Sequence, residues 1–201
     1  FSKDKLNDVQ KEIFKVNNLE EGYIRPMCFY GAQGMGLRAD NLKTHCIVAA
    51  WEWPSYMSPE AFDEGIKIKI SSYKRQTNNL VSRSKVNGNY VTSIMALQEA
   101  MQEGFDEALL LDDESNISEG SGENFFLVKD GKLITPDLAA SLNGITRKSI
   151  ISLAHEEEIE VKVKKINLNE ILDADELFFT GTAAEVVPIR TVDQNIIANG
   201  Q

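Results

Sequence analysis

The chain has few of the residues from which disulfide frameworks and metal sites are built. Its 201 residues include two cysteines, Cys28 and Cys46, and two histidines, His45 and His155. Two cysteines form neither a disulfide framework nor a metal-binding quartet, and so few histidines argue against a zinc site or a histidine-based triad. Sparse cysteine use is typical of reducing compartments. We therefore expect a cytoplasmic setting and chemistry that depends on other side chains.

An excess of positive charge and long apolar runs are also missing. The formal net charge is −10, whereas nucleic-acid binding needs clustered Lys and Arg. No apolar run approaches the roughly 18 residues that a membrane span requires, and no charged-then-apolar signal segment opens the chain. We therefore expect neither a nucleic-acid nor a membrane partner. The composition, 42% apolar and 26% charged, is typical of a globular protein.

What the sequence does contain is an alternation of helix and strand patterns. Residues 3–16 have apolar positions at helical spacing, and another helix is expected to begin near Tyr90, with Gly104 in the place of a C-terminal cap. Asn167 and Glu170 have capping-box spacing. A further helix is expected within residues 144–158, and strands over 46–53, 66–73, 107–112, 123–128, 132–135 and 160–166. Residues 176–186 are expected to form a buried strand that ends in a turn of small residues. The pattern predicts a mixed α/β fold.

Prolines and serines interrupt this pattern between Trp53 and Phe62. We expect a domain boundary there. Residues 1–53 would be the later part of a small N-terminal domain, residues 54–62 a connection, and residues 63–201 a larger α/β domain. Both ends of the chain look like cuts through something longer.

The stretch NISEGSGENFF places two glutamates on bendable backbone. Glu119 and Glu123 are separated by Gly120, Ser121 and Gly122, between runs that are predicted to be strands. Strands disfavour both Gly and Glu. Glycine-rich backbone can come close to a flat ligand, so Glu119 is a candidate binding residue.

Two further segments, SLNGITRKSI and TGTAAE, have the composition of anion-binding turns. In the first, Gly144 frees the backbone and Thr146 is predicted to cap a helix that starts at Arg147. In the second, Thr182 offers a hydroxyl, and its neighbours offer backbone N–H groups without bulk. A helix N-terminus exposes unpaired N–H groups and a partial positive charge, which suits phosphate. Taken singly, however, most such segments are only turns.

Lys85 precedes a flexible Asn-Gly step in SRSKVNGNYVTS. Most lysines are solvated surface charges, and a lysine that forms an imine must be neutral when it does so. A lysine, an isolated carboxylate and two anion-suited turns are together what pyridoxal 5'-phosphate requires. The lysine makes the Schiff base, the carboxylate keeps the ring nitrogen protonated, and the turns hold the phosphate. The combination therefore predicts a pyridoxal phosphate enzyme.

The motifs SKVNGNY, ISEGSGEN, NGITR and GTAAE occur together in this order. In these motifs, and across essentially its whole length, the chain resembles bacterial branched-chain amino acid aminotransferases, of pyridoxal phosphate fold type IV. The resemblance implies a small α/β domain, present here only in its later part, and a larger pseudo-barrel domain. The site would lie between them, close to a partner subunit. The resemblance therefore implies a homodimer at least.

The resemblance also assigns the cofactor site residue by residue. Lys85 looks like the Schiff-base lysine, which would also move the proton between the substrate α-carbon and the cofactor. Tyr90 looks like the residue whose hydroxyl bonds the cofactor's phenolic oxygen, and Glu119 looks like the partner of the ring nitrogen. Leu142 looks like the side chain packed on the ring face. The implied phosphate ligands are Ile145, Thr146 and Thr182, and the implied cradle for the substrate carboxylate is the backbone of Thr182 and Ala183.

On the substrate side, GYIRP supplies Tyr23 and Arg25. In the family these residues meet the second carboxylate of glutamate. Such a pocket must accept both an apolar side chain and a carboxylate, and a carboxylate buried without a partner is costly. Arg25 with Tyr23 could meet that carboxylate while leaving the rest of the wall apolar.

Other substrate-side residues are assigned in the same way. GMGL supplies Met35 and Leu37, on a loop that in the family reaches into the neighbouring subunit's pocket. WEWPSYM supplies Trp53 and Tyr56, which resemble the apolar wall around a branched side chain. The alternative for these two aromatics is simple core or interface packing.

The reaction implied is transamination between L-leucine, L-isoleucine or L-valine and 2-oxoglutarate, as in branched-chain amino acid biosynthesis. The products are branched 2-oxo acids and L-glutamate. D-Amino acid aminotransferases and aminodeoxychorismate lyases share the lysine and the phosphate turns, so they are alternatives. A non-catalytic segment that binds the cofactor or forms oligomers is a third. Family members are longer at both ends, and their N-terminal extension carries an arginine for the phosphate.

Overall fold

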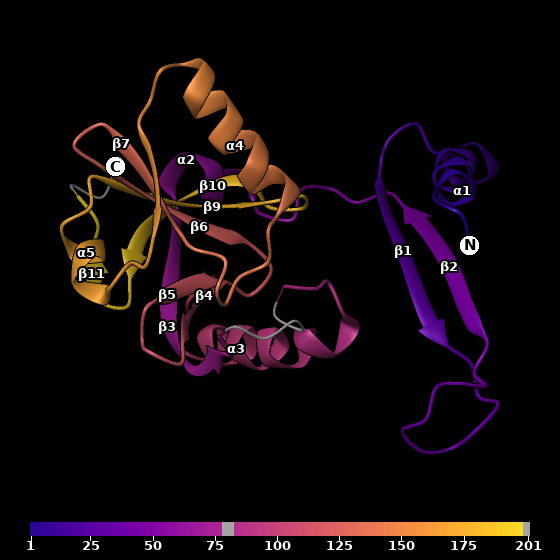
Figure 1. Ribbon diagram of the computed structural model, residues 1–201. Helices are drawn as coiled ribbons and strands as arrows, with labels where there is room; N and C mark the ends of the chain where they lie inside the picture. Colours follow the sequence, from indigo (N-terminus) through magenta and orange to yellow (C-terminus); the bar gives the residue numbers. More distant parts are fainter. Residues whose placement is uncertain (78–82, 199–201) are drawn as a thin grey trace. The chain divides into compact units, whose positions relative to one another are not determined.

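A computed structural model of the protein describes residues 1–77 and 83–198 (Figure 1). The chain divides into two compact units, Phe1–Tyr56 and Met57–Gln201. In the described part of the chain, no helix is long and apolar enough to cross a membrane.

The first unit consists of one helix and a two-stranded ribbon. Helix α1 (Lys3–Val16) begins after Ser2, whose hydroxyl accepts a hydrogen bond from the Lys5 N–H. Strands β1 (Tyr23–Tyr30) and β2 (Thr44–Trp51) pair antiparallel. The expected helix and the second of these strands are confirmed.

The second unit is built on a nine-stranded sheet. Its strands are β3 (Ile66–Arg75), β4 (Glu107–Asp112), β5 (Ile117–Gly120), β6 (Asn124–Lys129), β7 (Lys132–Pro136), β8 (Val161–Lys164), β9 (Glu176–Gly181), β10 (Glu185–Val192) and β11 (Asn195–Ile196). Its helices are α2 (Pro59–Glu64), the 3-10 turn η1 (Asn87–Asn89), α3 (Tyr90–Gln102), α4 (Ile145–Glu156) and α5 (Leu168–Leu172).

Part of this sheet closes on itself. The order β10-β3-β4-β5-β6 is completed by β9, which pairs with both β6 and β10. Closure removes free sheet edges, and side chains that alternate inward can then fill the interior. The expected mixed α/β fold with a pseudo-barrel is confirmed.

The barrel encloses a cluster of buried apolar side chains. Leu109, Phe125, Phe179 and Val187, from four different strands, have no solvent exposure, and the two phenylalanine rings meet edge to face at 6.0 Å. Burying each such side chain stabilises the fold by about 1.5–3 kcal/mol. Helix α3 packs outside, through Ala96 and other small residues, against β3 and β4.

Several local signals in the sequence are confirmed. Helix α3 begins at Tyr90, and Gly104 takes a positive φ of 83° just after its end. Asn167 and Glu170 form the predicted capping box at the start of α5. Tyr90 is the first residue of α3, and the candidate site lies at that end of the helix.

Candidate functional site

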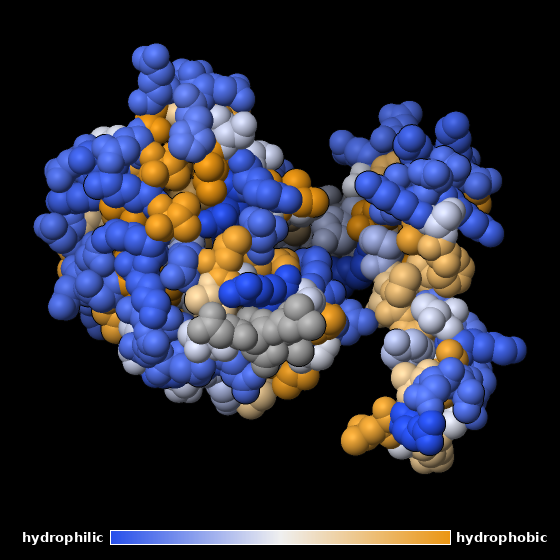
Figure 2. Space-filling view, viewed as in Figure 1, coloured by the Kyte–Doolittle hydropathy of each residue, from blue (hydrophilic) through white to orange (hydrophobic). Residues whose placement is uncertain are grey.

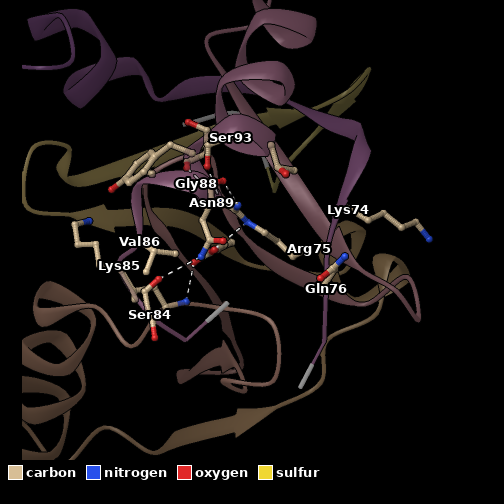
Figure 3. Close-up of a pocket in the computed structure, with 15 residues that line it drawn as sticks. Lys74, Arg75, Gln76, Ser84, Lys85, Val86, Gly88, Asn89 and Ser93 are labelled. Atoms are coloured by element: carbon tan, nitrogen blue, oxygen red, sulfur yellow. Dashed lines mark hydrogen bonds and ion pairs between the residues drawn. The ribbon is translucent and has the colours of Figure 1, made fainter. Parts of the chain in front are cut away.

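A cavity of about 260 Å³ lies beside the start of α3 (Figure 3). Its lining comes from the end of β3, the segment that leads into η1, the turn between β5 and β6, and the loop before α4. Four of the residues singled out in the sequence line it: Lys85, Tyr90, Glu119 and Leu142. The fold therefore brings together four side chains from three separate segments of the sequence.

Lys85 reaches the cavity from the irregular segment just before η1. Its side chain is exposed, and its Nζ lies 5.5 Å from the centre of the Tyr90 ring. Tyr90 is held in place because it is the first residue of α3. A second amine, Lys74, also lines the cavity, but its Nζ donates to Ser115 Oγ at 2.9 Å. Figure 3 shows Lys74 extending away from Arg75.

Glu119 is held at the cavity wall by an ion pair with Arg75. The Glu119 side chain is 11% exposed, and its Oε1 lies 3.0 Å from Arg75 Nε. Its Oε2 accepts a hydrogen bond from the Leu142 N–H at 3.0 Å. A carboxylate has lone-pair sites beyond these two. It can therefore still accept a hydrogen bond from a ligand.

Burial raises the pKa of Glu119, and Arg75, the Leu142 N–H and Lys85 oppose this effect. The dominant cause is the loss of hydration, which disfavours the charged form. A further positive charge at the carboxylate would act in the same direction as Arg75. The geometry thus suits a cationic or proton-donating ligand group.

Sequence reasoning missed Arg75. Its Nη2 donates to Ser93 Oγ at 2.6 Å and to the Ser121 carbonyl at 3.4 Å, and its Nη1 donates to the Asn89 carbonyl at 3.3 Å. The guanidinium therefore ties the β5–β6 turn to the start of α3, as Figure 3 shows for Asn89 and Ser93. Arg75 follows Lys74 at the end of a strand whose residues alternate in polarity, and it belongs to no recognisable motif. The sequence therefore contained no signal that could have identified Arg75 as a site residue.

The loop before α4 is connected to the cavity by Leu142 and Asn124. The Asn124 Nδ2 donates to the Leu142 carbonyl at 2.8 Å. Helix α4 begins at Ile145, with Gly144 as its N-cap and no side-chain cap. The prediction that Thr146 caps a helix starting at Arg147 is therefore wrong, because the helix starts two residues earlier and Thr146 lies inside its first turn.

The start of α4 has the properties of an anion site. The first N–H groups of a helix have no partner within the helix, and here no cap side chain covers them. Arg147 turns away into the interior, where its Nη2 donates to the Pro136 carbonyl at 3.0 Å. Ile145 and Thr146 lie in this first turn and do not line the described cavity. Their proposed role as phosphate ligands thus remains a prediction.

Thr182 and Ala183 lie in the turn between β9 and β10. Neither lines the described cavity. Asn124 lies between this turn and the cavity in the sheet. Its register partner on β5 is Glu119, and its register partner on β9 is Thr180. The carboxylate-binding role of the turn remains a prediction.

The substrate-side residues all belong to the first unit, so the structure does not place them at the cavity of the second. Tyr23 packs against Trp53 at 4.7 Å between ring centres, and Trp53 lies 6.1 Å from Tyr56. The Arg25 guanidinium lies 5.5 Å above the Tyr23 ring. These contacts join an arginine to an aromatic cluster on one face of the β1–β2 ribbon.

The loop between β1 and β2 exposes apolar side chains. Met35 and Leu37 are fully exposed within this unit. Figure 2 shows hydrophobic atoms at the free end of this loop. Large exposed apolar side chains that gather in one place are typical of contact surfaces.

We expect Gly144→Ala to disrupt the connection between Asn124 and the α4 turn. A Cβ at position 144 would lie 2.2 Å from Asn124 Oδ1. Overpacking of this kind costs about 1–3 kcal/mol, so the thermal unfolding temperature should fall. Gly122→Ala is the matched control, because nothing lies within 4 Å of its added Cβ. Equal unfolding temperatures for the two variants would contradict the expectation.

Comparison with known proteins gives one family for this chain. Residues 1–192 match the family model described as amino-transferase class IV. The branched-chain-amino-acid aminotransferase of Pseudomonas aeruginosa is 51% identical over 202 residues, which is 100% of this chain and 66% of the relative. That of Escherichia coli K12 is 41% identical, over 98% of this chain and 65% of the relative. The chain thus spans about two thirds of the length of these curated relatives.

Solved structures give the same result. A crystal structure of the branched-chain amino acid aminotransferase of Escherichia coli has a TM-score of 0.96 at 40% identity, covering 100% of this chain and 67% of the other. The pyridoxal 5'-phosphate (PLP) form of the branched-chain amino acid aminotransferase of Thermobaculum terrenum has a TM-score of 0.89 at 30% identity. The match covers 100% of this chain and 66% of the other. A structural relative therefore holds the cofactor that the motifs of this chain predict.

Proposed function

The chain belongs to the class IV aminotransferase family, and we propose that it carries out pyridoxal 5'-phosphate-dependent transamination. The substrates proposed are L-leucine, L-isoleucine or L-valine with 2-oxoglutarate, and the products are branched 2-oxo acids and L-glutamate. One observation carries the proposal: Lys85 and the buried carboxylate of Glu119 line the same cavity. The names of the relatives support the choice of branched-chain substrates.

The residues present fit pyridoxal 5'-phosphate. Glu119 would face the ring nitrogen, Tyr90 would lie at the phenolic oxygen and Leu142 at the ring face. The uncapped start of α4 and Thr182 would hold the phosphate. Glu119 is buried enough for a further positive group beside it to be favourable. When bound, the cofactor supplies an electron sink for the bond-breaking step.

Lys85 would have two tasks. Its amine would hold the cofactor, and as a free amine it would move a proton to and from the substrate α-carbon. Both tasks need an amine that is free to move, and the exposed position of Lys85 beside Tyr90 allows this. The Tyr90 ring, 5.5 Å from Nζ, limits the directions that the amine can take.

Arg25 and Tyr23 are proposed to recognise the side-chain carboxylate of glutamate. Arg25 lies against aromatic rings, so its charge is available next to an apolar surface. Trp53 and Tyr56 would supply the apolar wall for branched side chains. Such a surface accommodates both substrate types without burying an unpaired carboxylate.

The assembly and setting are also proposals. We propose a cytoplasmic homodimer at least, in which the loop carrying Met35 and Leu37 reaches the partner's pocket. The full exposure of these two side chains supports this.

Substrate tests on the purified protein decide between the proposal and its alternatives. We expect leucine with 2-oxoglutarate to give glutamate, and D-alanine and aminodeoxychorismate to be poor substrates. Borohydride should fix the cofactor absorption onto the peptide containing Lys85. Turnover of D-alanine or aminodeoxychorismate in place of leucine would select the other enzymes of this fold. A fixed cofactor without any turnover would select the non-catalytic alternative.

A further inference from the structure

Asn124, the first residue of β6, lies behind the cavity wall. It is 6% exposed and does not line the described cavity, whereas Glu119 and Leu142 both do. Its register partner on β5 is Glu119. Any effect of the Asn124 side chain on a ligand in the cavity must therefore pass through the residues that it contacts.

The first of these residues is Leu142. The Asn124 Nδ2 donates to the Leu142 carbonyl at 2.8 Å, and the Gly144 N–H donates to the same oxygen at 2.9 Å. The Leu142 N–H donates in turn to Glu119 Oε2 at 3.0 Å. Leu142 is thus held through both its N–H and its carbonyl. The amide of Asn124 is connected to the carboxylate of Glu119 through this one residue.

The second is Gly144, the N-cap of α4. Its φ of −62° and ψ of 150° are values that other residues also adopt, so the backbone conformation does not require glycine. The available space does require it, because a Cβ would lie 2.2 Å from Asn124 Oδ1. Helices usually have Ser, Thr, Asp or Asn at the N-cap. Asn124 occupies the space of such a side chain, and the first N–H groups of α4 stay uncapped.

The two ends of one amide therefore contact both parts of the proposed cofactor site. The Nδ2 end leads through Leu142 to Glu119, the proposed partner of the ring nitrogen. The Oδ1 end lies against the start of α4, the proposed phosphate site. The backbone of Asn124 is itself fixed in the sheet, between strands β5 and β9. A short, planar group on a rigid element is suited to hold two sites at a set distance.

We propose that Asn124 is a positioning residue that holds Glu119 and the start of α4 at the separation at which one molecule of pyridoxal 5'-phosphate engages both. The proposal rests on the proposed function for the identity of the ligand, whereas the contacts through which Asn124 acts belong to the protein alone. A ligand that engages two sites at once gains affinity only when the distance between the sites matches it. A ligand that uses one of the sites gains nothing from that distance.

Each of the two sites also has an anchor that does not involve Asn124. Arg75 holds Glu119 through the ion pair at 3.0 Å. Arg147, in the first turn of α4, donates to the Pro136 carbonyl at 3.0 Å. Loss of the Asn124 amide should therefore leave both sites in existence and disturb their separation.

Three probes distinguish the separation of the sites from the integrity of each site. Pyridoxal 5'-phosphate carries both ring and phosphate, pyridoxal lacks the phosphate, and inorganic phosphate lacks the ring. In Asn124→Ala the dissociation constant of pyridoxal 5'-phosphate should rise about tenfold, as expected for the loss of one buried hydrogen bond. The constants of pyridoxal and of inorganic phosphate should each change by less than about twofold. Absorption titrations measure the first two, and phosphorus NMR measures the third.

Ser118→Ala is the matched control. The Ser118 Oγ donates to the Ala140 carbonyl of the same loop at 3.1 Å, and Ser118 is 2% exposed. The variant thus removes the same kind of bond, from a buried side chain to a carbonyl of the loop, without removing a contact of Leu142 or Gly144. It should lower the unfolding temperature, as Asn124→Ala does, and leave the affinity for all three probes unchanged.

Hydrogen exchange in the cofactor-free protein reports the contacts themselves. The N–H groups of Leu142 and Gly144 should exchange about tenfold faster in Asn124→Ala than in Ser118→Ala, because the Leu142 carbonyl has lost its anchor. Gly144→Ala is the second variant, and it decides the question if Asn124→Ala does not fold. Its Cβ displaces the start of α4 from Asn124, so it should give the same pattern with the three probes.

Two patterns of binding would overturn the proposal. Weaker binding of all three probes would mean that Asn124 only supports the local fold, and unchanged binding of pyridoxal 5'-phosphate would mean that the separation does not depend on it. Unchanged exchange at Leu142 and Gly144 would overturn it as well. If exchange and binding change as expected but the wild type does not turn over leucine, the proposed transamination alone is wrong.

Discussion

Lys85→Ala is expected to reduce transamination by about 10⁴-fold, at the upper end of what loss of a general acid–base costs. The loss should be this large because one amine is given two tasks, holding the cofactor and moving the α-proton. Leucine and 2-oxoglutarate should suffer equally, since both half-reactions use the same proton transfer. Steady-state kinetics with each substrate, together with borohydride fixation, measure the effect.

Two matched variants separate the role of this amine from that of positive charge at the site. Lys74→Ala removes the other amine of the cavity lining, whose Nζ is turned toward Ser115, and should leave the rate within about twofold, as for a surface charge. Lys85→Arg keeps the charge but cannot give up its proton near neutral pH, so it should be as slow as Lys85→Ala. Substantial activity in Lys85→Arg would show that charge, and not proton transfer, is what position 85 supplies.

The sequence correctly predicted the helices whose formation depends on nearby residues, through apolar spacing or capping. The apolar period places α3, and the Asn167–Glu170 capping box marks α5. The strand Tyr23–Tyr30 was not predicted, because Pro26 interrupts a run that otherwise suits a strand. Strand β5 was not predicted either, since Glu119 and Gly120 disfavour strands. In both cases pairing with a neighbour overrides the local preference.

Barrel closure could not be read from the sequence. It depends on β9 pairing with both β6 and β10, and no local pattern encodes which distant strands meet. The resemblance to a family implied a pseudo-barrel, whereas the residues alone indicated only a mixed α/β fold. Closure is what brings Asn124 between Glu119 and Thr180, and so relates two segments that the sequence offered as separate turns.

At the site, the sequence predicted the residues that stand in recognisable motifs. It did not predict the residues that hold those side chains in position. Lys85 and Glu119 stand in recognisable segments, and the cavity unites them. Arg75 ends an ordinary strand, and Glu107 opens one. Only packing shows that Arg75 pairs with Glu119, and only the folded structure shows that Glu107 is fully buried. Residues of this kind can be identified only from their contacts in the folded protein.

Glu119→Ala is expected both to destabilise the second unit and to slow transamination. Arg75 would remain largely buried without its carboxylate, and breaking a buried ion pair in this way costs about 3–5 kcal/mol. The ring nitrogen would lose the charge that stabilises its proton, and loss of one preorganised electrostatic group costs roughly 10²–10³-fold in kcat. Thermal unfolding and leucine kinetics on the same preparation measure the two effects.

The double variant Arg75→Met/Glu119→Met separates these two losses. Replacing a buried ion pair by apolar side chains of similar volume is often neutral or stabilising, and methionine adapts to irregular space. The unfolding temperature should therefore recover toward that of wild type while kcat remains as low as in Glu119→Ala. Recovery of both would show that Glu119 acts only as a partner for Arg75. Recovery of stability alone would mean that the acid at position 119 acts on the reaction itself, beyond holding Arg75 in place.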